Sequence, residues 1–302
     1  MKKILLFADD RKEKAKETAL SLQDWLSKKK IKAALRSSLT PLNSEELRDT
    51  DLIVSFGGDG TILRLAHSAS PFGIPIFPID LGGLGFLATS QPDQAKKALE
   101  EILKGNFKVE KRMMLETTVK KIGGSKNHSR SKTFHALNEV VLHKGGAERL
   151  LHLKMLISGE EITGYSADGL IVSTSTGSTA YSLSAGGPIV SPKLDVFVVT
   201  AICPHALSAR PIVFSADEII QLVPIRKDRE FFLTFDGYKT ISGKNQEITI
   251  EKSQYFCGLI FMHQDFYHNL KTKLQWAGEY KRLELGKSSD RAEIQGDRWN
   301  DS

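Results

Sequence analysis

The sequence is poor in cysteine and contains no long apolar run. Only two cysteines, Cys203 and Cys257, occur among 302 residues, and their spacing matches no metal motif. Two isolated thiols fit a reducing compartment, where structural disulfides are rare. No stretch approaches the ~20 apolar residues that a membrane span requires, and the apolar run at residues 4–8 ends at Asp9, too early for an export signal. We therefore expect a cytoplasmic protein without a membrane partner.

Paired histidines and nucleic-acid motifs are missing as well. None of the eight histidines forms an HxxH-type pair, so we expect no metal cage built by the protein. The formal net charge of +6 favours anionic ligands, but no helix-turn-helix, zinc-finger or aromatic-basic signature accompanies it. We expect no nucleic-acid partner, and a cleft for phosphorylated small molecules accounts for the charge.

The first hundred residues alternate between strand and helix patterns. Apolar side chains recur at helical spacing over residues 13–29 and again over residues 95–102. Buried strands are predicted at residues 3–8, 31–35, 52–56 and 74–79. This alternation predicts a mainly parallel sheet covered by helices, and we assign it to an α/β domain at residues 1–107.

From residue 108 onward the chain consists of short runs rich in Val, Ile, Leu, Phe and Thr, separated by glycine and polar turns. This texture predicts a β-rich domain at residues 108–285, with one helix around residues 178–185. Strands are predicted at residues 109–122, 132–143, 149–158, 169–174, 196–201, 219–225, 231–235, 247–251 and 255–261. Residues 123–131 predict a mobile hairpin loop, and the polar tail at residues 286–302 is expected to be disordered.

A glycine loop directly after a predicted strand is the most informative motif. The sequence GGDGT places Gly57, Gly58 and Gly60 around Asp59, with Thr61 leading into a helix-compatible stretch. Glycines expose backbone N–H groups to an oxyanion, and a helix N-terminus adds its positive dipole end. A carboxylate 4 Å from a phosphate costs about 1 kcal/mol in water and about 4 kcal/mol at an effective dielectric near 20. Such a carboxylate indicates chemistry, because it can take a proton from a hydroxyl or hold Mg²⁺ against phosphates. The loop therefore predicts phosphoryl transfer.

Two shorter clusters have both a structural and a functional interpretation. The glycine-rich segment at residues 80–86 is either a turn with Phe86 in the core or a second loop in the same crevice, because both loops follow strands. The adjacent Asn138 and Glu139 lie in a strand-like run. Either one of the two side chains is solvated and the other contacts a turn, or the pair binds a sugar diol. An amide and a carboxylate suit a diol because together they offer both donor and acceptor.

The densest cluster runs from Asp168 to Pro188, where a strand leads into a Ser/Thr/Gly loop that opens a helix. A helix cap at Ser178 or Thr179 is the structural interpretation. The number of hydroxyls and glycines exceeds what capping needs, so we favour a nucleotide site in which Tyr181 stacks on or bonds a ribose. Further on, residues 203–212 predict a rigid connector with two prolines. Asp236 and Gly237 predict a hairpin turn or, alternatively, a carboxylate facing the cleft.

Taken in this order, the segments resemble the NAD kinase family. The resemblance covers roughly residues 1–280. It rests on GGDGT at 57–61, NE at 138–139, TGSTAY at 176–181, GGP at 186–188, the CPH-LS-RP segment at 203–211 and DG at 236–237. GGDGT alone also occurs in diacylglycerol-type and sphingosine-type lipid kinases. TGSTAY together with the NE pair is what narrows the resemblance to NAD kinases.

The resemblance implies a Rossmann-like N-terminal domain followed by an all-β C-terminal domain, with the active site between them. It implies that ATP, with Mg²⁺ held mainly by the ATP phosphates, phosphorylates the adenosine ribose 2′-hydroxyl of NAD to give NADP. Asp59 is then the base or orienter of that hydroxyl, and Gly57, Gly58, Gly60 and Thr61 form the phosphate loop. The implied NAD-binding residues are Asp59, Gly60, Phe86, Asn138, Glu139, Asp168, Thr179, Ala180, Tyr181, Ser184 and Asp236. Family members form homodimers or homotetramers in which neighbouring subunits help to complete the site.

Two departures from the family pattern concern the loops. Asp80 and Gly83 stand where the family often has Asn and Arg, and Ser175 replaces a proline ahead of TGSTAY. The alternatives are a lipid kinase, which needs a membrane-contacting face, and a non-catalytic NADP-binding protein, which gains nothing from Asp59 beside phosphate. The choice between ATP, other nucleotides and polyphosphate, and between NAD and NADH, stays open at the level of the sequence, as do feedback regulation and subunit number.

Overall fold

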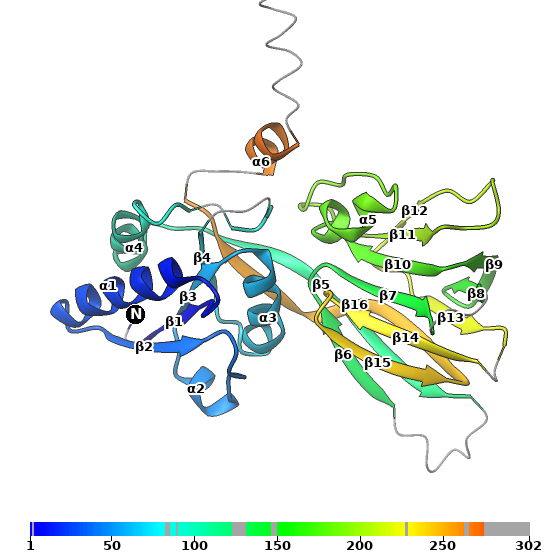
Figure 1. Ribbon diagram of the computed structural model, residues 1–302, viewed down its shortest axis with the longest axis horizontal. Helices are drawn as coiled ribbons and strands as arrows, with labels where there is room; N and C mark the ends of the chain where they lie inside the picture. Colours follow the sequence, from blue (N-terminus) through cyan, green and yellow to red (C-terminus); the bar gives the residue numbers. More distant parts are fainter. Residues whose placement is uncertain are drawn as a thin grey trace, which may run out of the picture.

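The chain folds into an α/β half and a β-rich half (Figure 1). The computed structural model describes residues 1, 3–81, 85–88, 90–122, 131–145, 150–226, 229–262 and 266–274. Two expectations, the mobility of residues 123–130 and the disorder of residues 286–302, lie outside the described residues, as does Gly83. Within the described part, no helix has both the length and the apolar character to cross a membrane.

The α/β half is built on a parallel sheet in the order β2-β1-β3-β4. Its strands are β1 (Lys3–Ala8), β2 (Lys32–Ser37), β3 (Leu52–Gly57) and β4 (Ile76–Asp80). Its helices are α1 (Glu13–Lys28), α2 (Ser44–Arg48), α3 (Asp59–Ala69) and α4 (Ala95–Lys104). A 3₁₀ turn, η1 (Ser70–Phe72), directly follows α3. The predicted alternation of strands and helices is confirmed.

Both faces of this sheet are covered, which explains why β1 and β3 are mostly apolar. In β1, Ile4 and Leu6 pack against α1 and α4, whereas Leu5 and Phe7 pack on the opposite face against α3. Successive side chains in a strand point to opposite faces, so a strand buried on both sides is apolar at most positions. The arrangement leaves the carboxyl ends of β3 and β4 as the place where polar loops meet.

The β-rich half is a sandwich of two sheets with the orders β12-β11-β10-β7-β14-β15 and β16-β13-β8-β9, the latter continuing the sheet of the α/β half. Its first strands are β5 (Val109–Lys121), β6 (Lys132–Ala136), β7 (Glu139–Lys144), β8 (Leu151–Ile157), β9 (Glu160–Ala167) and β10 (Gly169–Thr174). Then follow β11 (Val196–Ile202), β12 (Ile212–Ser215), β13 (Ile220–Pro224), β14 (Glu230–Phe235), β15 (Lys239–Lys244) and β16 (Gln246–Ile260). The helical elements are η2 (Gly177–Thr179), α5 (Tyr181–Ser184) and α6 (Phe266–Lys273).

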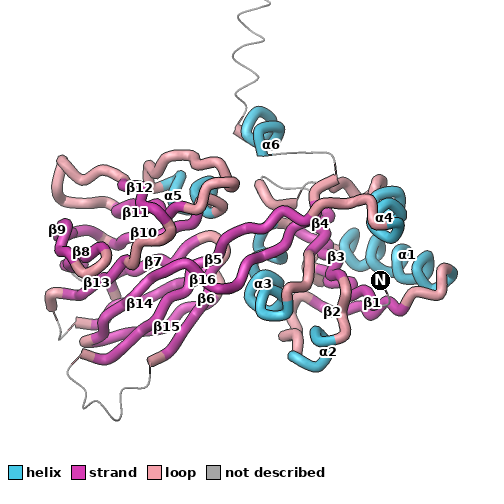
Figure 2. The backbone as a smooth tube through the Cα atoms, turned by 180° about the vertical axis from the view of Figure 1, so that it is seen from behind, coloured by secondary structure: helices cyan, strands magenta, loops and turns pink. Residues whose placement is uncertain are grey.

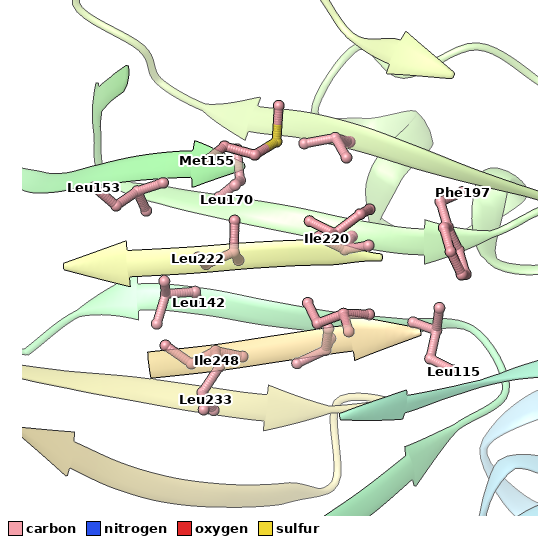
Figure 3. Close-up of a cluster of buried hydrophobic side chains, with 14 of the residues drawn as sticks. Leu115, Leu142, Leu153, Met155, Leu170, Phe197, Ile220, Leu222, Leu233 and Ile248 are labelled. Atoms are coloured by element: carbon pink, nitrogen blue, oxygen red, sulfur yellow. The ribbon is translucent and has the colours of Figure 1, made fainter. Parts of the chain in front are cut away.

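The core of the sandwich is formed by one face of each sheet (Figure 3). Leu142, Leu170 and Leu233 project from the six-stranded sheet toward Leu222 and Ile248 of the other sheet. These side chains are at most 1 % exposed. Because strand side chains alternate, the odd-numbered residues of β7 are left on the outer face of the six-stranded sheet.

Strand β16 joins the two halves into one sheet. It pairs with β5 over most of its length, passes through a bulge between Lys252 and Phe256, and then pairs with β4 in parallel at Leu259 and Ile76. Figure 2 shows β5 and β16 running together from the β-rich half into the α/β half. The two strands predicted at 247–251 and 255–261 are therefore one strand, and the polar residues between them form the bulge. The domain division at residue 107 stays a prediction.

Several elements differ from the sequence-based expectations. The predicted strand at 132–143 is split into β6 and β7, because the chain turns at Leu137 and Asn138 to let Asp236 bind their N–H groups. The helix expected over residues 178–185 is shortened to η2 and α5. Helices α2 and α6 and strands β9, β12 and β15 were not predicted.

Candidate functional site

Asp59 is the first residue of α3, and its carboxylate faces the backbone of the second glycine loop. Its Oδ2 accepts a hydrogen bond from the N–H of Phe86 at 2.7 Å, and its Oδ1 accepts from Leu87 at 3.0 Å and Ala88 at 3.3 Å. The start of α3 and the residues that follow the second predicted loop thus lie in contact. A carboxylate has about four acceptor positions, so three donors leave one position for a substrate hydroxyl.

The close approach of Asp59 accounts for Gly85. A Cβ at residue 85 would lie 2.2 Å from Oδ1 of Asp59, which no real Cβ tolerates. By contrast, a Cβ on Gly58 or Gly60 would meet no atom within 4 Å. Gly85 is therefore required by packing. Gly58 and Gly60 instead border open space in front of the α3 N-terminus, where an anionic ligand has room.

The environment of Asp59 makes it a stronger base than an exposed aspartate. Burial raises the pKa of the Asp59 carboxyl, while the three N–H donors of Phe86, Leu87 and Ala88 and the charge of Lys273 oppose that rise. The net direction is upward. A raised pKa favours proton uptake during a reaction, provided that the group still ionises at working pH.

A second locus is a cavity of about 570 Å³ on the outer face of the six-stranded sheet. Its lining residues are Glu139, Val141, His143, Lys144, Asp168, Tyr181, Ile202, Thr234 and Gly237. The alternate β7 residues Val140 and Leu142 belong to the sandwich core, which places the lining residues on the opposite face. Three predicted residues, Glu139, Asp168 and Tyr181, therefore meet in one cavity.

Two polar residues in this cavity were not predicted from the sequence. Lys144 Nζ lies 2.7 Å from Oδ1 of Asp168, and His143 Nε2 lies 3.2 Å from the hydroxyl of Thr234. For His143 the available signal was its alternation with Val140 and Leu142, because in a strand with one core face the other residues share a second face; Lys144 is the last residue of β7 and had no such signal. Lys144 adds positive charge beside Asp168.

Asn138 and Glu139 are each only 6 % exposed. Among the described residues, Asn138 Oδ1 and Glu139 Oε2 are buried oxygens without a hydrogen-bond partner. Burial, with a further contribution from Asp236, raises the pKa of Glu139 to about 8. Buried polar atoms in native proteins are nearly always paired, so the unpaired oxygens of these two residues are available to a polar ligand.

Asp236 occupies the β14–β15 turn at a φ of +48°, which confirms the predicted hairpin turn. Its Oδ1 accepts from the N–H groups of Asn138 (2.7 Å) and Glu139 (3.1 Å), and its Oδ2 accepts from Leu137 (2.8 Å) and contacts His67 Nε2 at 3.0 Å. All acceptor positions are occupied by protein groups, which favours a positioning role. Direct NAD binding by Asp236 stays a prediction.

The loop that follows β10 is packed tightly against the Asn138 backbone. A Cβ at Gly177 would lie 2.1 Å from the carbonyl oxygen of Asn138, and the Thr174 hydroxyl donates to the carbonyl of Leu137 at 2.7 Å. Thr179 donates to the carbonyl of Thr176 at 3.3 Å and is half-buried, as is Ala180. Tyr181 is 45 % exposed and lines the cavity.

Not every predicted residue reaches the cavity. Ser184, the last residue of α5, is exposed and lies outside the lining, and Phe86 belongs to the Asp59 locus. The lining also does not include Asn138, Thr179, Ala180 or Asp236. The two loci are linked through α3, which carries Asp59 at its start and His67 two turns later, where His67 contacts Asp236. The NAD-binding roles expected for Ser184 and Phe86 stay predictions.

Helix α6 supplies two further residues that the sequence analysis missed. Asn269, which is 2 % exposed, donates to the carbonyl oxygen of Phe86 at 3.1 Å. Lys273 Nζ lies 3.7 Å from Oδ2 of Asp80, the last residue of β4. In the sequence α6 has a weak apolar pattern, so nothing marked a helix at this point of the predicted β-rich domain.

The described residues contain no group of three or more His, Cys, Asp or Glu side chains placed to hold a metal ion. The carboxylates at the loop ends, Asp59 and Asp80, offer at most two oxygen-donor groups. Mg²⁺ prefers six oxygen ligands, so two carboxylates do not suffice to hold it without further ligands such as the phosphates of a donor.

Two family models match the chain. The model described as ATP-NAD kinase N-terminal domain matches residues 4–107, and the model described as ATP-NAD kinase C-terminal domain matches residues 137–261. Similar proteins include an NAD kinase of Heliobacterium modesticaldum, 39% identical over 279 residues, which is 88% of this chain and 96% of that protein. An NAD kinase of Clostridium botulinum (strain Loch Maree / Type A3) is 42% identical over 236 residues, 78% of this chain and 82% of that protein.

Two solved structures share the fold. Yeast NADH kinase complexed with NADH has a TM-score of 0.80 and 25% identity, covering 91% of this chain and 88% of that one. An NAD kinase from Archaeoglobus fulgidus in complex with ATP has a TM-score of 0.72 and 27% identity, covering 91% and 99% of the two chains.

Proposed function

The chain belongs to the ATP-NAD kinase family, and from this premise we propose how its residues perform the reaction. The protein is an NAD kinase, a phosphotransferase that uses ATP to phosphorylate NAD. We assign the acceptor as the 2′-hydroxyl of the adenosine ribose, so that the product is NADP. The observation that supports this assignment most is Asp59, a carboxylate of raised pKa with one acceptor position left beside open glycines.

The dinucleotide is proposed to occupy the crevice formed by the cavity and the Asp59 locus. Asn138 and Glu139 carry buried unpaired oxygens that suit ribose hydroxyl donors. Tyr181 is exposed at the cavity wall and offers an aromatic face for a base or ribose. Asp168, paired with Lys144, offers a second carboxylate in the cavity lining.

In the proposed step, the 2′-hydroxyl oxygen attacks the γ-phosphorus of ATP. The bond between that phosphorus and the β–γ bridging oxygen breaks, ADP leaves, and the hydroxyl proton passes to Asp59. Phosphoryl transfer goes through a loose transition state, so the protein contributes mainly positioning and charge neutralisation. A general base adds a factor of roughly 10²–10⁴ in rate.

Mg²⁺ is proposed to enter with ATP, held mainly by the ATP phosphates. When bound, the ion would neutralise part of the negative charge of these phosphates. Gly58 and Gly60 border the open space at the α3 N-terminus, and the backbone N–H groups there suit the phosphate oxygens. We also propose a cytoplasmic homodimer or homotetramer, as the family resemblance implies.

A coupled assay tests the proposal. The purified chain is incubated with NAD, ATP and Mg²⁺, and the product is fed to an NADP-specific dehydrogenase whose reduced coenzyme is measured. NADP formation that requires NAD, ATP and Mg²⁺ is the expected result. Tight NADP binding without turnover would instead indicate a silent binder, and phosphorylation of diacylglycerol or sphingosine in vesicles would indicate a lipid kinase. Parallel arms with NADH as acceptor and polyphosphate as donor define the specificity.

A further inference from the structure

Helix α6 lies outside both sheets, above the loops of the α/β half and next to the gap between the halves, in both views (Figures 1 and 2). One of its side chains is hydrogen-bonded to the backbone of the α/β half. The amide of Asn269 donates to the carbonyl of Phe86 at 3.1 Å, and Phe86 in turn donates its N–H to Asp59 at 2.7 Å. Asn269 and Leu270 are both buried. The helix is therefore connected to the proposed base through a single residue.

The same helix also places a positively charged side chain close to this locus. Lys273 is the last residue of α6, its side chain is only 16 % exposed, and its Nζ lies 3.7 Å from Asp80 Oδ2. Asp80 ends β4 and is the register partner of Gly57 in β3. Asp59 follows Gly57 by two residues, so Asp59 and Asp80 stand at neighbouring strand ends with Lys273 beside them.

Two carboxylates at the loop ends create an electrostatic problem for a phosphate donor. A polyanion must approach within contact distance of Asp59 for its phosphate to be transferred, and each carboxylate repels it. The dipole of α3 and the loop N–H groups compensate partly. A lysine held by a helix from another part of the chain adds a full positive charge, and a mostly buried ammonium is screened less than an exposed one.

We propose that Lys273 is a donor-binding residue whose ammonium turns from Asp80 to the phosphates of ATP, and that α6 holds it at the Asp59 locus through Asn269. This inference rests on the proposed function and deepens it. Burial sets the upward direction of the Asp59 pKa, and the Lys273 charge is among the groups that oppose it.

The test compares Lys273→Gln with Lys273→Arg and with Lys271→Gln, a matched control on the exposed side of the same helix. KM for ATP and KM for NAD are measured separately, and binding of a non-hydrolysable ATP analogue is measured by calorimetry. We expect Lys273→Gln to raise KM for ATP and Kd for the analogue by about 10- to 100-fold, the usual value of a charge-assisted bond. KM for NAD should stay within about twofold, Lys273→Arg should restore most of the ATP affinity, and Lys271→Gln should match the parent.

Asp80→Asn provides a prediction of opposite sign. Removing this carboxylate removes one competitor for the Lys273 ammonium, so ATP binding should tighten severalfold. A purely structural role for the ion pair would make both variants less stable and would not move ATP affinity in opposite directions. An unchanged KM for ATP in Lys273→Gln, or weaker ATP binding in Asp80→Asn, overturns the inference. If the parent protein has no NAD kinase activity, the proposed function fails. If the parent is active and only these shifts are missing, the inference alone fails.

Discussion

The imidazole Nε2 of His67 lies 3.0 Å from Oδ2 of Asp236, and this contact joins α3 of the α/β half to the β14–β15 turn of the β-rich half. The same carboxylate binds the N–H groups of residues 137–139, which lead into β7. One buried side chain thereby positions the segment carrying Glu139 relative to the helix that begins with Asp59.

Replacing Asp236 with asparagine should be much more damaging than replacing His67. An amide has a single acceptor oxygen, so Asp236→Asn leaves buried N–H groups of residues 137–139 without an acceptor, and we expect a loss of about 2–4 kcal/mol in the free energy of unfolding. His67→Ala removes one contact and should cost about 1 kcal/mol. Urea unfolding measures both; equal losses would mean that the N–H contacts carry little energy.

Asp59→Asn should separate chemistry from binding. We expect kcat to fall by roughly 10²–10⁴, because the base is lost, while NAD affinity measured by calorimetry stays nearly unchanged. The structure adds a stability effect, since the amide cannot accept from all three N–H groups of residues 86–88, and a loss of about 1–3 kcal/mol follows. An intact kcat with a much weaker Mg²⁺ requirement would show that the role of Asp59 is misassigned.

Gly85→Ala should act on the reaction by displacing Asp59. The new Cβ would lie 2.2 Å from Oδ1, so the carboxylate or the loop must move, and a shift of about 1 Å can reduce kcat by about 10²-fold. Gly164→Ala in β9 is the control, because its Cβ would sit 3.6 Å from the nearest atom, an ordinary contact. Steady-state kinetics and melting temperatures are measured for both variants. A Gly85→Ala enzyme with the parental kcat would contradict the proposed close approach of residue 85 to the Asp59 carboxylate.

Glu139 should make stability fall as pH rises. Its pKa is raised to about 8 by burial and by Asp236, above the ordinary value of 4.5, so between these values the folded state binds more protons than the unfolded state. Its stabilising contribution is complete below pH 4.5 and is lost as pH rises through about 8, with a slope of at most about 1.4 kcal/mol per pH unit.

Glu139→Gln removes this slope without changing the size of the side chain. The difference in free energy of unfolding between the parent and this variant, measured without ligand from pH 5 to pH 8, should change in favour of the variant as pH rises. Other titrating groups are common to both proteins and cancel in the difference. Glu160→Gln at the exposed start of β9 is the control. Parallel curves for the parent and Glu139→Gln would refute the assignment.

Tyr181→Ala should weaken dinucleotide binding more than it slows the reaction. Tyr181 is 45 % exposed in the free protein, so its removal should leave the melting temperature nearly unchanged. Loss of a stacked aromatic face should raise Kd for NAD by about tenfold or more, and Tyr181→Phe should retain most of the affinity. Unchanged NAD affinity in calorimetry would count against the assignment of this cavity to the dinucleotide.

Much of the architecture was predictable because its signals are local. The largely apolar runs of β1 and β3 follow from burial on both faces, and the spacing of Ala15, Ala19, Leu22 and Leu26 follows from the single buried face of α1. The family was recognisable from motifs contiguous in the chain, and the comparisons confirm it, together with the α/β and all-β fold class.

The residue types at the strand ends, namely glycines, a carboxylate and a hydroxyl-rich turn, could be read from the sequence alone. Their contacts were set by the packing of sheets and helices: Asp59 accepts from the N–H groups of residues 86–88, Asp236 accepts from those of residues 137–139, and Lys273 lies beside Asp80. These contacts join residues 27 to 193 positions apart, counted from Asp59 to Phe86 and from Asp80 to Lys273. A hydrogen bond or ion pair between distant segments leaves no periodic trace in the chain, because it depends on how sheets and helices pack and not on local spacing.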